Sequence, residues 1–177
     1  MKKQTYLSLM VLMASSVYCG AGELLKNPSF ESDISKYDKS GWDSRGPREI
    51  TLTKVSEPVM DGKYALLVDG RTGPQWEGVK QVVKLKPGKA YRLAGAVRLG
   101  EGEKSGKGAV QLIKTLKDGT NIYQDIFRGT ITADAYTNFS EIFSYDEKDV
   151  KVTTISVHGF EDRRSFIVDN FSLTEVE

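Results

Sequence analysis

Short runs of alternating apolar and polar residues recur along this chain, and they limit what it can fold into. The run AYRLAGAVRL, residues 90–99, is the clearest example. Its odd-numbered residues, from Tyr91 to Leu99, share one face of an extended strand, and its even-numbered residues share the other. No segment after residue 23 shows the apolar period of a long helix. The pattern therefore predicts an all-β protein.

Nine such runs are separated by turn residues such as Gly, Pro, Asn and Asp. They span residues 50–55, 64–68, 79–85, 90–99, 109–116, 122–127, 138–145, 153–160 and 166–176. Pro87-Gly88 and Asp118-Gly119 supply tight turns, and residues 100–108, GEGEKSGKG, read as a flexible hairpin loop. This spacing predicts an antiparallel β-sandwich.

The length and charge of the chain indicate one domain with no general affinity for polyanions. The chain has 177 residues, which suits a single core. It carries 25 basic and 24 acidic side chains, for a formal net charge of +1. This balance gives no reason to expect nucleic acid or an anionic membrane as a partner.

Residues 1–21 have the features of a secretory signal peptide. Lys2 and Lys3 are followed by an apolar run, and small residues precede a cleavage position after Ala21. A buried N-terminal helix is the alternative. We expect a mature domain of residues 22–177 that is secreted, periplasmic or on the cell surface.

Cys19 is the only cysteine of the chain. Cleavage after Ala21 would leave no cysteine for a disulfide, a thiol nucleophile or a metal site. Lipid attachment at Cys19 is an alternative that would place the protein on a membrane, but Tyr18 occupies the preceding position, where a small residue is expected. Without lipid we expect no membrane association.

The sequence offers little catalytic machinery. His158 is the only histidine, and no G-x-S-x-G, P-loop or G-x-G-x-x-G motif accompanies it. Glu161 and Asp162 are the tempting carboxylate pair of a glycosidase, but adjacent strand residues point to opposite faces. We expect no enzyme, and a small hydrolase remains as an alternative.

Five segments in order resemble the carbohydrate-binding modules of the family 4, 9 and 22 group, closest to family 22. They are LLKNPSFES at 24–32, SGW at 40–42, DGKYALLVDGRT at 61–72 with Trp-x-Gly at 76–78, LKPGKAYRLAGAVRL at 85–99 and FIVDNFSL at 166–173. The resemblance implies an antiparallel β-sandwich of the jelly-roll, galactose-binding-domain-like kind, whose concave sheet binds a polysaccharide such as xylan. It also implies a structural calcium ion and no catalysis. We expect a monomer, with Trp42 anchoring the core beneath the sheet.

Sugar rings stack their C–H faces on aromatic rings, and their hydroxyls bind planar polar groups. Arg71 and Trp76 match the family's Arg-Thr and Trp-x-Gly positions and supply such a pair. They lie in the Gly- and Pro-containing stretch DGRTGPQWEG, which is poor core material. Either Arg45 or Arg48 fills the place of an early arginine on the same sheet. Trp76 as a core residue and Arg71 as a loop brace are the alternatives.

Tyr123 matches the position of a ligand-contacting tyrosine in the family. Asp125 and Phe127 have the same parity on this strand, which predicts a mixed face.

The chain departs from family 22 before its last strand, where Ser156 and His158 stand in place of a tyrosine and a ligand-binding glutamate. Ile155 and Val157 are expected to face the core, so that Ser156 and His158 face the open side. His158 is either part of the site or a solvated strand residue. A structural or protein-interaction sandwich that has lost the sugar site is therefore the alternative function.

Glu31 and Asp169 are the candidate calcium ligands that the resemblance implies. Calcium prefers carboxylate and carbonyl oxygens, and backbone carbonyls of the turn near Lys63 would complete its shell. We expect Glu31 and Asp169 to lie on neighbouring strands, with Asp169 on a buried face. A buried carboxylate needs a partner, so a hydrogen-bonded or ion-paired Asp169 is the alternative.

Overall fold

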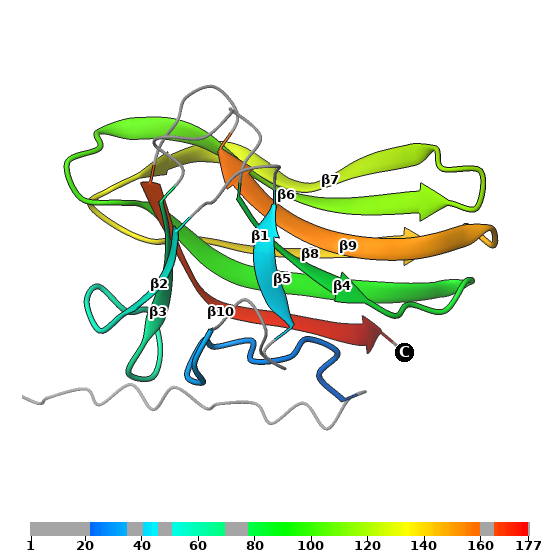
Figure 1. The fold of residues 1–177 in the computed structure, drawn as a ribbon, viewed down its shortest axis with the longest axis horizontal. Helices are drawn as coiled ribbons and strands as arrows, with labels where there is room; N and C mark the ends of the chain where they lie inside the picture. Colours follow the sequence, from blue (N-terminus) through cyan, green and yellow to red (C-terminus); the bar gives the residue numbers. More distant parts are fainter. Residues whose placement is uncertain (1–21, 35–40, 46–50, 70–77, 160–164, 177) are drawn as a thin grey trace, which may run out of the picture.

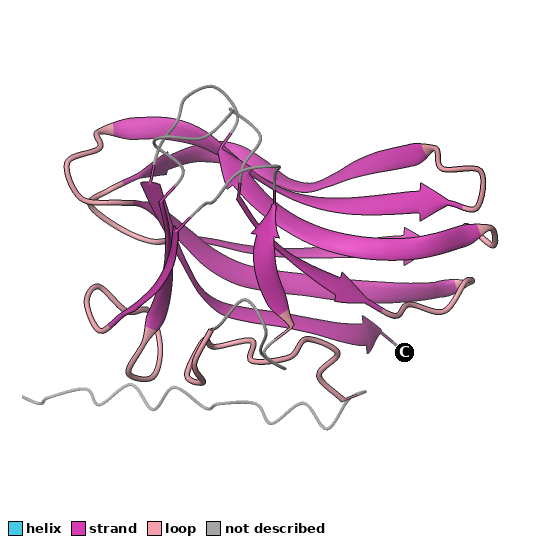
Figure 2. Cartoon of the chain, viewed as in Figure 1, coloured by secondary structure: helices cyan, strands magenta, loops and turns pink. Residues whose placement is uncertain are grey.

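The computed structural model describes residues 22–34, 41–45, 51–69, 78–159 and 165–176. These residues form ten strands and no helix, and accordingly no helix among them could cross a membrane (Figure 2). The strands are β1 (Trp42–Arg45), β2 (Thr51–Val55), β3 (Ala65–Asp69), β4 (Gly78–Val83), β5 (Lys89–Leu99), β6 (Ser105–Leu116), β7 (Asn121–Thr132), β8 (Thr137–Tyr145), β9 (Val150–Gly159) and β10 (Ser165–Val176).

The strands form two five-stranded sheets packed face to face (Figure 1). One sheet has the order β1-β4-β9-β6-β7, and the other has the order β2-β3-β10-β5-β8. Every neighbouring pair is antiparallel. The predicted antiparallel β-sandwich is confirmed.

The strand pattern of the sequence was right for most of the chain, but it missed β1, began β6 too late and ended at 127 a strand, β7, that continues to Thr132. β1 was missed because its four residues, WDSR, are too short to alternate visibly. The loop expected at 100–108 is too long, because β6 begins at Ser105 and contains Gly106 and Gly108. A Cβ on Gly108 would lie 2.9 Å from Cδ1 of Ile131, so a larger residue there would displace the end of that side chain.

The alternation of β5 fixes which side of its sheet faces the core. Tyr91, Leu93 and Leu99 are at most 2% exposed, whereas Arg92 between them is exposed. They belong to one hydrophobic core with apolar side chains of β6 and β9 from the opposite sheet, including Leu112 and Ile155. The face predicted from the sequence is therefore the buried face.

An aromatic cluster closes one part of the core. The ring of Phe30 lies 5.1 Å from that of Trp42 and 6.2 Å from that of Phe171, centroid to centroid. Trp42 is 3% exposed, and its Nε1 donates a hydrogen bond of 3.0 Å to the carbonyl oxygen of Asn27. The prediction that Trp42 anchors the core is confirmed.

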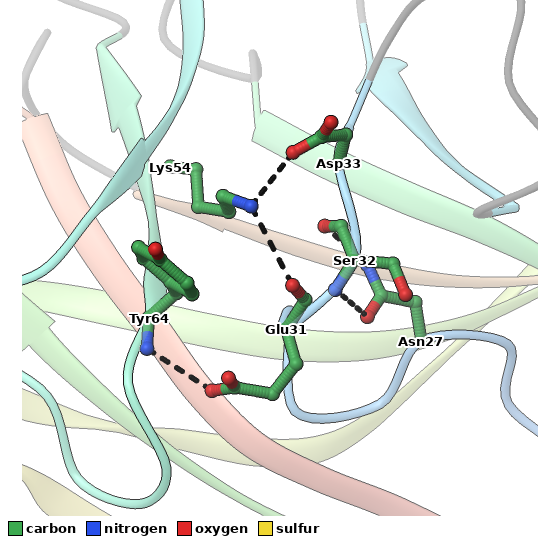
Figure 3. A network of polar contacts seen from close by, with 6 residues as sticks. All are labelled: Asn27, Glu31, Ser32, Asp33, Lys54 and Tyr64. Carbon is green, nitrogen blue, oxygen red and sulfur yellow. Dashed lines mark hydrogen bonds and ion pairs between the residues drawn. The ribbon is translucent and has the colours of Figure 1, made fainter.

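The NPSFES segment is a folded loop that places this cluster. The Asn27 side chain accepts a hydrogen bond from the Ser32 amide at 3.0 Å and donates one to the Ser32 carbonyl at 3.1 Å (Figure 3). Phe30 adopts a φ of 57° and is fully buried. The Phe171 amide donates to the Pro28 carbonyl at 3.0 Å, which ties the loop to β10. These contacts give the motif a structural role.

Candidate functional site

The β1-β4-β9-β6-β7 sheet has one face turned away from the core, which we call the outer face. Val110 and Leu112 of β6 and Ile155 and Val157 of β9 belong to the core. Because side chains alternate along a strand, the residues between them point to the outer face. The register of the strands arranges those residues in rows that run across the sheet.

One row is mainly apolar. Val82 pairs with Thr154, Thr154 with Ile113, and Ile113 with Tyr123, so this apolar row crosses four strands. Val82 is 61% exposed and Tyr123 is 56% exposed, and the two residues between them are half-buried. The structure therefore places Tyr123 on an accessible sheet face, at the end of an apolar strip.

The next row is polar. It consists of Lys80, Ser156, Gln111 and Asp125, again on four neighbouring strands. Nε2 of Gln111 donates to Oδ1 of Asp125 at 2.7 Å. Nε of Arg128, from the row beyond, donates to Oδ2 of Asp125 at 2.7 Å. A linked set of polar groups thus lies beside the apolar row.

A β-bulge in β7 brings Arg128 to the outer face. Val110 pairs with Phe127 while Gln111 pairs with Asp125, so Ile126 is an extra residue in β7. The prediction that Phe127 shares a face with Tyr123 is wrong, because beyond the bulge Phe127 packs against the core and stacks on Phe139 at 5.4 Å. Alternation alone would have sent Arg128 inward.

His158 lies on the outer side of β9, but it is not solvated. Its side chain is 1% exposed, and its Nε2 is 2.9 Å from Oε1 of Gln111. It pairs with Gly78 on one side and Ala109 on the other, and a Cβ on Gly78 would lie 2.9 Å from that of His158. Ser156 is fully buried as well. The interpretation of His158 as a solvated strand residue is therefore wrong.

The environment of Asp125 keeps its carboxylate ionised. Partial burial acts to raise the pKa of Asp125, but hydrogen bonds from Arg128 and Gln111 outweigh it and hold that pKa below the ordinary aspartate value. The charge of His158 when protonated acts in the same direction. Asp125 is consequently a hydrogen-bond acceptor near neutral pH.

Several predicted site residues fall outside the described residues, namely Arg71, Trp76, Arg48 and the pair Glu161 and Asp162. The backbone of Arg45 ends β1 opposite Gly78, at the level of His158 in the sheet. Gln111 and Arg128 were missed by the sequence reasoning. The parity shared by Tyr123 and Asp125 was the available signal, but nothing in the sequence marks the bulge that adds Arg128.

Glu31 and Asp169 meet the same turn, residues 60–64, and we call this group the turn cluster. Oε1 of Glu31 accepts a hydrogen bond from the amide of Lys63 at 2.9 Å. It accepts a second from the amide of Tyr64 at 3.0 Å (Figure 3). These backbone donors lower the pKa of the Glu31 carboxyl. Glu31 lies in a loop before β1, so its predicted place on a strand is wrong. Lys54 forms an ion pair with Asp33, with 2.7 Å between Nζ and Oδ1. Figure 3 marks this pair beside Glu31.

Asp169 binds the other half of the turn. It is fully buried, as predicted, and its Oδ2 accepts from the amides of Met60 at 2.7 Å and Asp61 at 3.1 Å. Its Oδ1 accepts from the Asn170 amide at 2.7 Å. Burial still raises the pKa of Asp169 above the ordinary value despite these donors. These contacts match the alternative of a hydrogen-bonded structural aspartate.

The turn cluster partly fits a calcium ion. A carboxylate offers about four acceptor positions, and the three amide bonds of Asp169 leave about one. The amides of Lys63 and Tyr64 both bind Oε1 of Glu31, which leaves Oε2 for a cation. No group of three or more His, Cys, Asp or Glu residues suited to a metal occurs in the part of the chain that the structure describes. Backbone carbonyls or water would have to supply the remaining ligands.

The comparison with protein families decides the kind of domain. The model of a carbohydrate-binding domain family, covering modules of families 4 and 9, matches residues 22–162. The chain belongs to this family of carbohydrate-binding domains. No curated protein matches the sequence.

Solved structures with the same fold agree with this assignment. The domain is similar to the CBM22-1 xylan-binding domain of Paenibacillus barcinonensis Xyn10C, with a TM-score of 0.75 and 19% identity over 89% of this chain and 97% of that one. It is also similar to the CBM22-1 and GH10 modules of Clostridium thermocellum endo-1,4-beta-D-xylanase 10B complexed with xylohexaose. That match has a TM-score of 0.69 and 19% identity, over 88% of this chain and 29% of that one.

A structure described as "CBM4 structure and function" matches with a TM-score of 0.58 and 14% identity, over 86% of this chain and 99% of that one. The carbohydrate-binding module of the 4, 9 and 22 group that the sequence motifs indicated is confirmed.

Proposed function

We propose that this domain binds a polysaccharide on the outer face of the β1-β4-β9-β6-β7 sheet. The observation that carries the proposal is that two rows lie side by side on this face. One is apolar and contains the exposed ring of Tyr123, and the other is polar and contains Asp125. A sugar ring has apolar C–H faces and a polar rim, so a stacking surface beside hydrogen-bonding groups suits it.

The dimensions of the apolar row suit a short stretch of an extended glycan. The row from Val82 to Tyr123 crosses three gaps between strands, or about 14 Å at the usual strand spacing. One strand spacing is similar to the length of one β-linked sugar unit. A glycan that runs across the strands would therefore meet a new strand with each unit.

Xylan is the first ligand to test, because the family 22 structures of this fold are described as xylan-binding. We propose a β-linked polysaccharide with stacking on Tyr123 and on Trp76, which the sequence places in the loop before β4. Ser156 and His158 are buried and offer no stacking surface. The exposed ring of Tyr123 beside the accessible carboxylate of Asp125 favours this function over a protein-interaction sandwich that has lost its sugar site.

We propose that the domain is non-catalytic and exported. The matched modules are of a non-catalytic kind, although some are joined to glycoside hydrolases. Nε2 of His158 is committed to Gln111, so the described outer face has no exposed histidine to act as a general base. Export rests on the signal-like residues 1–21 alone.

We also propose a structural calcium ion at the turn cluster. Glu31 and Asp169 would supply its charge, and carbonyls near Lys63 would complete its shell. The support is that both carboxylates reach one turn from distant parts of the chain.

Retention in affinity gels tests the polysaccharide site. Tyr123→Ala and Trp76→Ala should each abolish most of the retardation that soluble xylan or β-glucan imposes on the wild-type domain, because each removes a stacking ring. Ile142→Ala is a matched control, since Ile142 is 55% exposed on β8 of the opposite sheet. Retardation of Tyr123→Ala equal to that of the wild type would remove the outer face as the binding site.

A further inference from the structure

Four polar side chains form a continuous hydrogen-bonded line across the outer face. His158 on β9 contacts Gln111 on β6 at 2.9 Å, and Gln111 contacts Asp125 on β7 at 2.7 Å. Arg128 contacts the second carboxylate oxygen of Asp125 at 2.7 Å. We call this line the outer-face network. It joins the three strands β9, β6 and β7 through side chains.

Chemistry fixes the direction of every hydrogen bond in the network. Ionised Asp125 can only accept, so Gln111 must present its amide nitrogen to Asp125. The amide oxygen of Gln111 then faces His158, and Nε2 of His158 must carry a proton in order to donate. Gln111 and Arg128 thus donate directly to the carboxylate of Asp125, and His158 donates to the amide oxygen of Gln111.

The exposed fraction of the residues increases along the network, from His158 to Asp125 and Arg128. His158 is 1% exposed and Gln111 is 8% exposed, whereas the side chains of Asp125 and Arg128 are 38% and 53% exposed. A carboxylate has about four acceptor positions. Gln111 and Arg128 are the two described residues that donate to Asp125. The network therefore ends in an accessible carboxylate whose remaining acceptor positions have a fixed orientation.

Asp125 is placed to act together with Tyr123. The two residues are two positions apart on β7, on the same face, where side chains lie about 7 Å apart. A sugar ring stacked on Tyr123 would therefore have its rim near Asp125.

We propose that Asp125 accepts a hydrogen bond from a hydroxyl of the sugar that stacks on Tyr123, and that Gln111 and His158 are positioning residues for this carboxylate. The proposal rests on the polysaccharide site proposed above and defines its ligand more closely. An anionic acceptor selects a neutral sugar that donates a hydroxyl at this point, and it disfavours a uronate carboxylate.

The first test measures affinity by titration calorimetry, with xylohexaose and soluble β-glucan as probes. Asp125→Ala should weaken binding about tenfold or more, because a hydrogen bond to a charged group is lost. Asp149→Ala is the matched control. It removes the same charge and a surface ion pair, that of Lys117 with Asp149 at 2.9 Å, which lies in the turns that follow β6 and β8. This control should bind like the wild type.

The second test needs no ligand, because His158 is the single histidine of the chain and gives unambiguous imidazole NMR signals in a protein without a histidine tag. At about pH 8, above the ordinary histidine pKa, the wild type should show the Nε2–H tautomer. In Asp125→Asn, the side-chain oxygen of the new asparagine should stay hydrogen-bonded to Arg128, because arginine can only donate. The NH₂ group of the asparagine then faces Gln111. Gln111 must then turn over, and His158 should change to the Nδ1–H tautomer.

The outcomes separate the two proposals. Normal affinity of Asp125→Ala for a probe that the wild type binds would overturn the assignment of Asp125 and leave the polysaccharide site standing. Failure of the wild type to bind either probe would remove the polysaccharide site for these glycans, and the assignment with it. An Nδ1–H tautomer in the wild type, or no change of tautomer in Asp125→Asn, would overturn the positioning role of Gln111 and His158.

Discussion

The outer-face network and the turn cluster both contain carboxylates, but they use them differently. In the outer-face network, Asp125 accepts from two side chains and remains partly exposed. In the turn cluster, Asp169 accepts from three backbone amides and is fully buried. The backbone amides that bind Asp169 are held in place by the main chain. The side chains that bind Asp125 reach it only because strand pairing places them next to it.

Because of this difference, we expect the turn cluster to contribute to the stability of the domain and the outer-face network to contribute to ligand binding. A carboxylate that satisfies backbone amides holds a turn in place, and its loss leaves buried donors without partners. A carboxylate held by side chains at an accessible face keeps acceptor positions for a ligand. We therefore expect substitutions in the turn cluster to act mainly on the free energy of unfolding. Substitutions in the outer-face network should act mainly on affinity.

The largest effect is expected for Asp169→Ala. Three amides, those of Met60, Asp61 and Asn170, would lose their acceptor, so the free energy of unfolding should fall by about 3 kcal/mol or more. Asp169→Asn retains one acceptor oxygen and should lose less. Urea unfolding measures both changes.

The affinity of folded Asp169→Ala for xylohexaose should stay at the wild-type value. A loss of affinity as large as that of Asp125→Ala, with the protein still folded, would break the distinction between the two regions.

Calcium should produce an intermediate effect that is confined to the turn cluster. An ion present at about 100 times its dissociation constant stabilises by about 2.7 kcal/mol, which raises the Tm of a domain of this size by about 5–10 °C. Scanning calorimetry with calcium and then with excess chelator measures the shift.

Glu31→Gln should reduce this shift, and Asp125→Asn should retain all of it. Equal Tm values with calcium and with chelator would contradict the proposed calcium site and leave Glu31 and Asp169 as purely hydrogen-bonded groups.

The smallest effect is the pH dependence that Asp125 contributes. Its pKa is lowered in the folded protein, so its stabilising contribution is complete above the unfolded aspartate pKa of about 3.9. The contribution disappears as the pH falls through the lowered folded value. Exposed pairs contribute up to about 1 kcal/mol, so the change should not exceed that.

The difference in unfolding free energy between the wild type and Asp125→Asn isolates this contribution. Measured by urea unfolding below about pH 5, where an ordinary histidine is already protonated, the difference should shrink as the pH falls below about 4. A difference that grows over this acidic range would mean that the network does not favour the ionised carboxylate.

Particular residues show how far the sequence predicts the fold and the site. The alternation of β5 and the turns at Gly88 and Gly119 were predictable because they are local, and both glycines have the positive φ that such turns require. Tyr123 was predictable as a surface residue of β7. The burial of His158 was not, since it depends on contacts across the sheet, such as the one with Gln111 of the neighbouring strand β6.

The sequence by itself determined the antiparallel sandwich, the family and the presence of Asp169 on a buried face. The sandwich and the face of Asp169 follow from the alternation of residues within single strands. The family follows from the order of the motifs along the chain. The tertiary structure alone decided that Glu31 and Asp169 share one turn and that a bulge carries Arg128 to Asp125. Both depend on the pairing register of distant segments, because a shift of one residue in a strand changes the face of every side chain that follows.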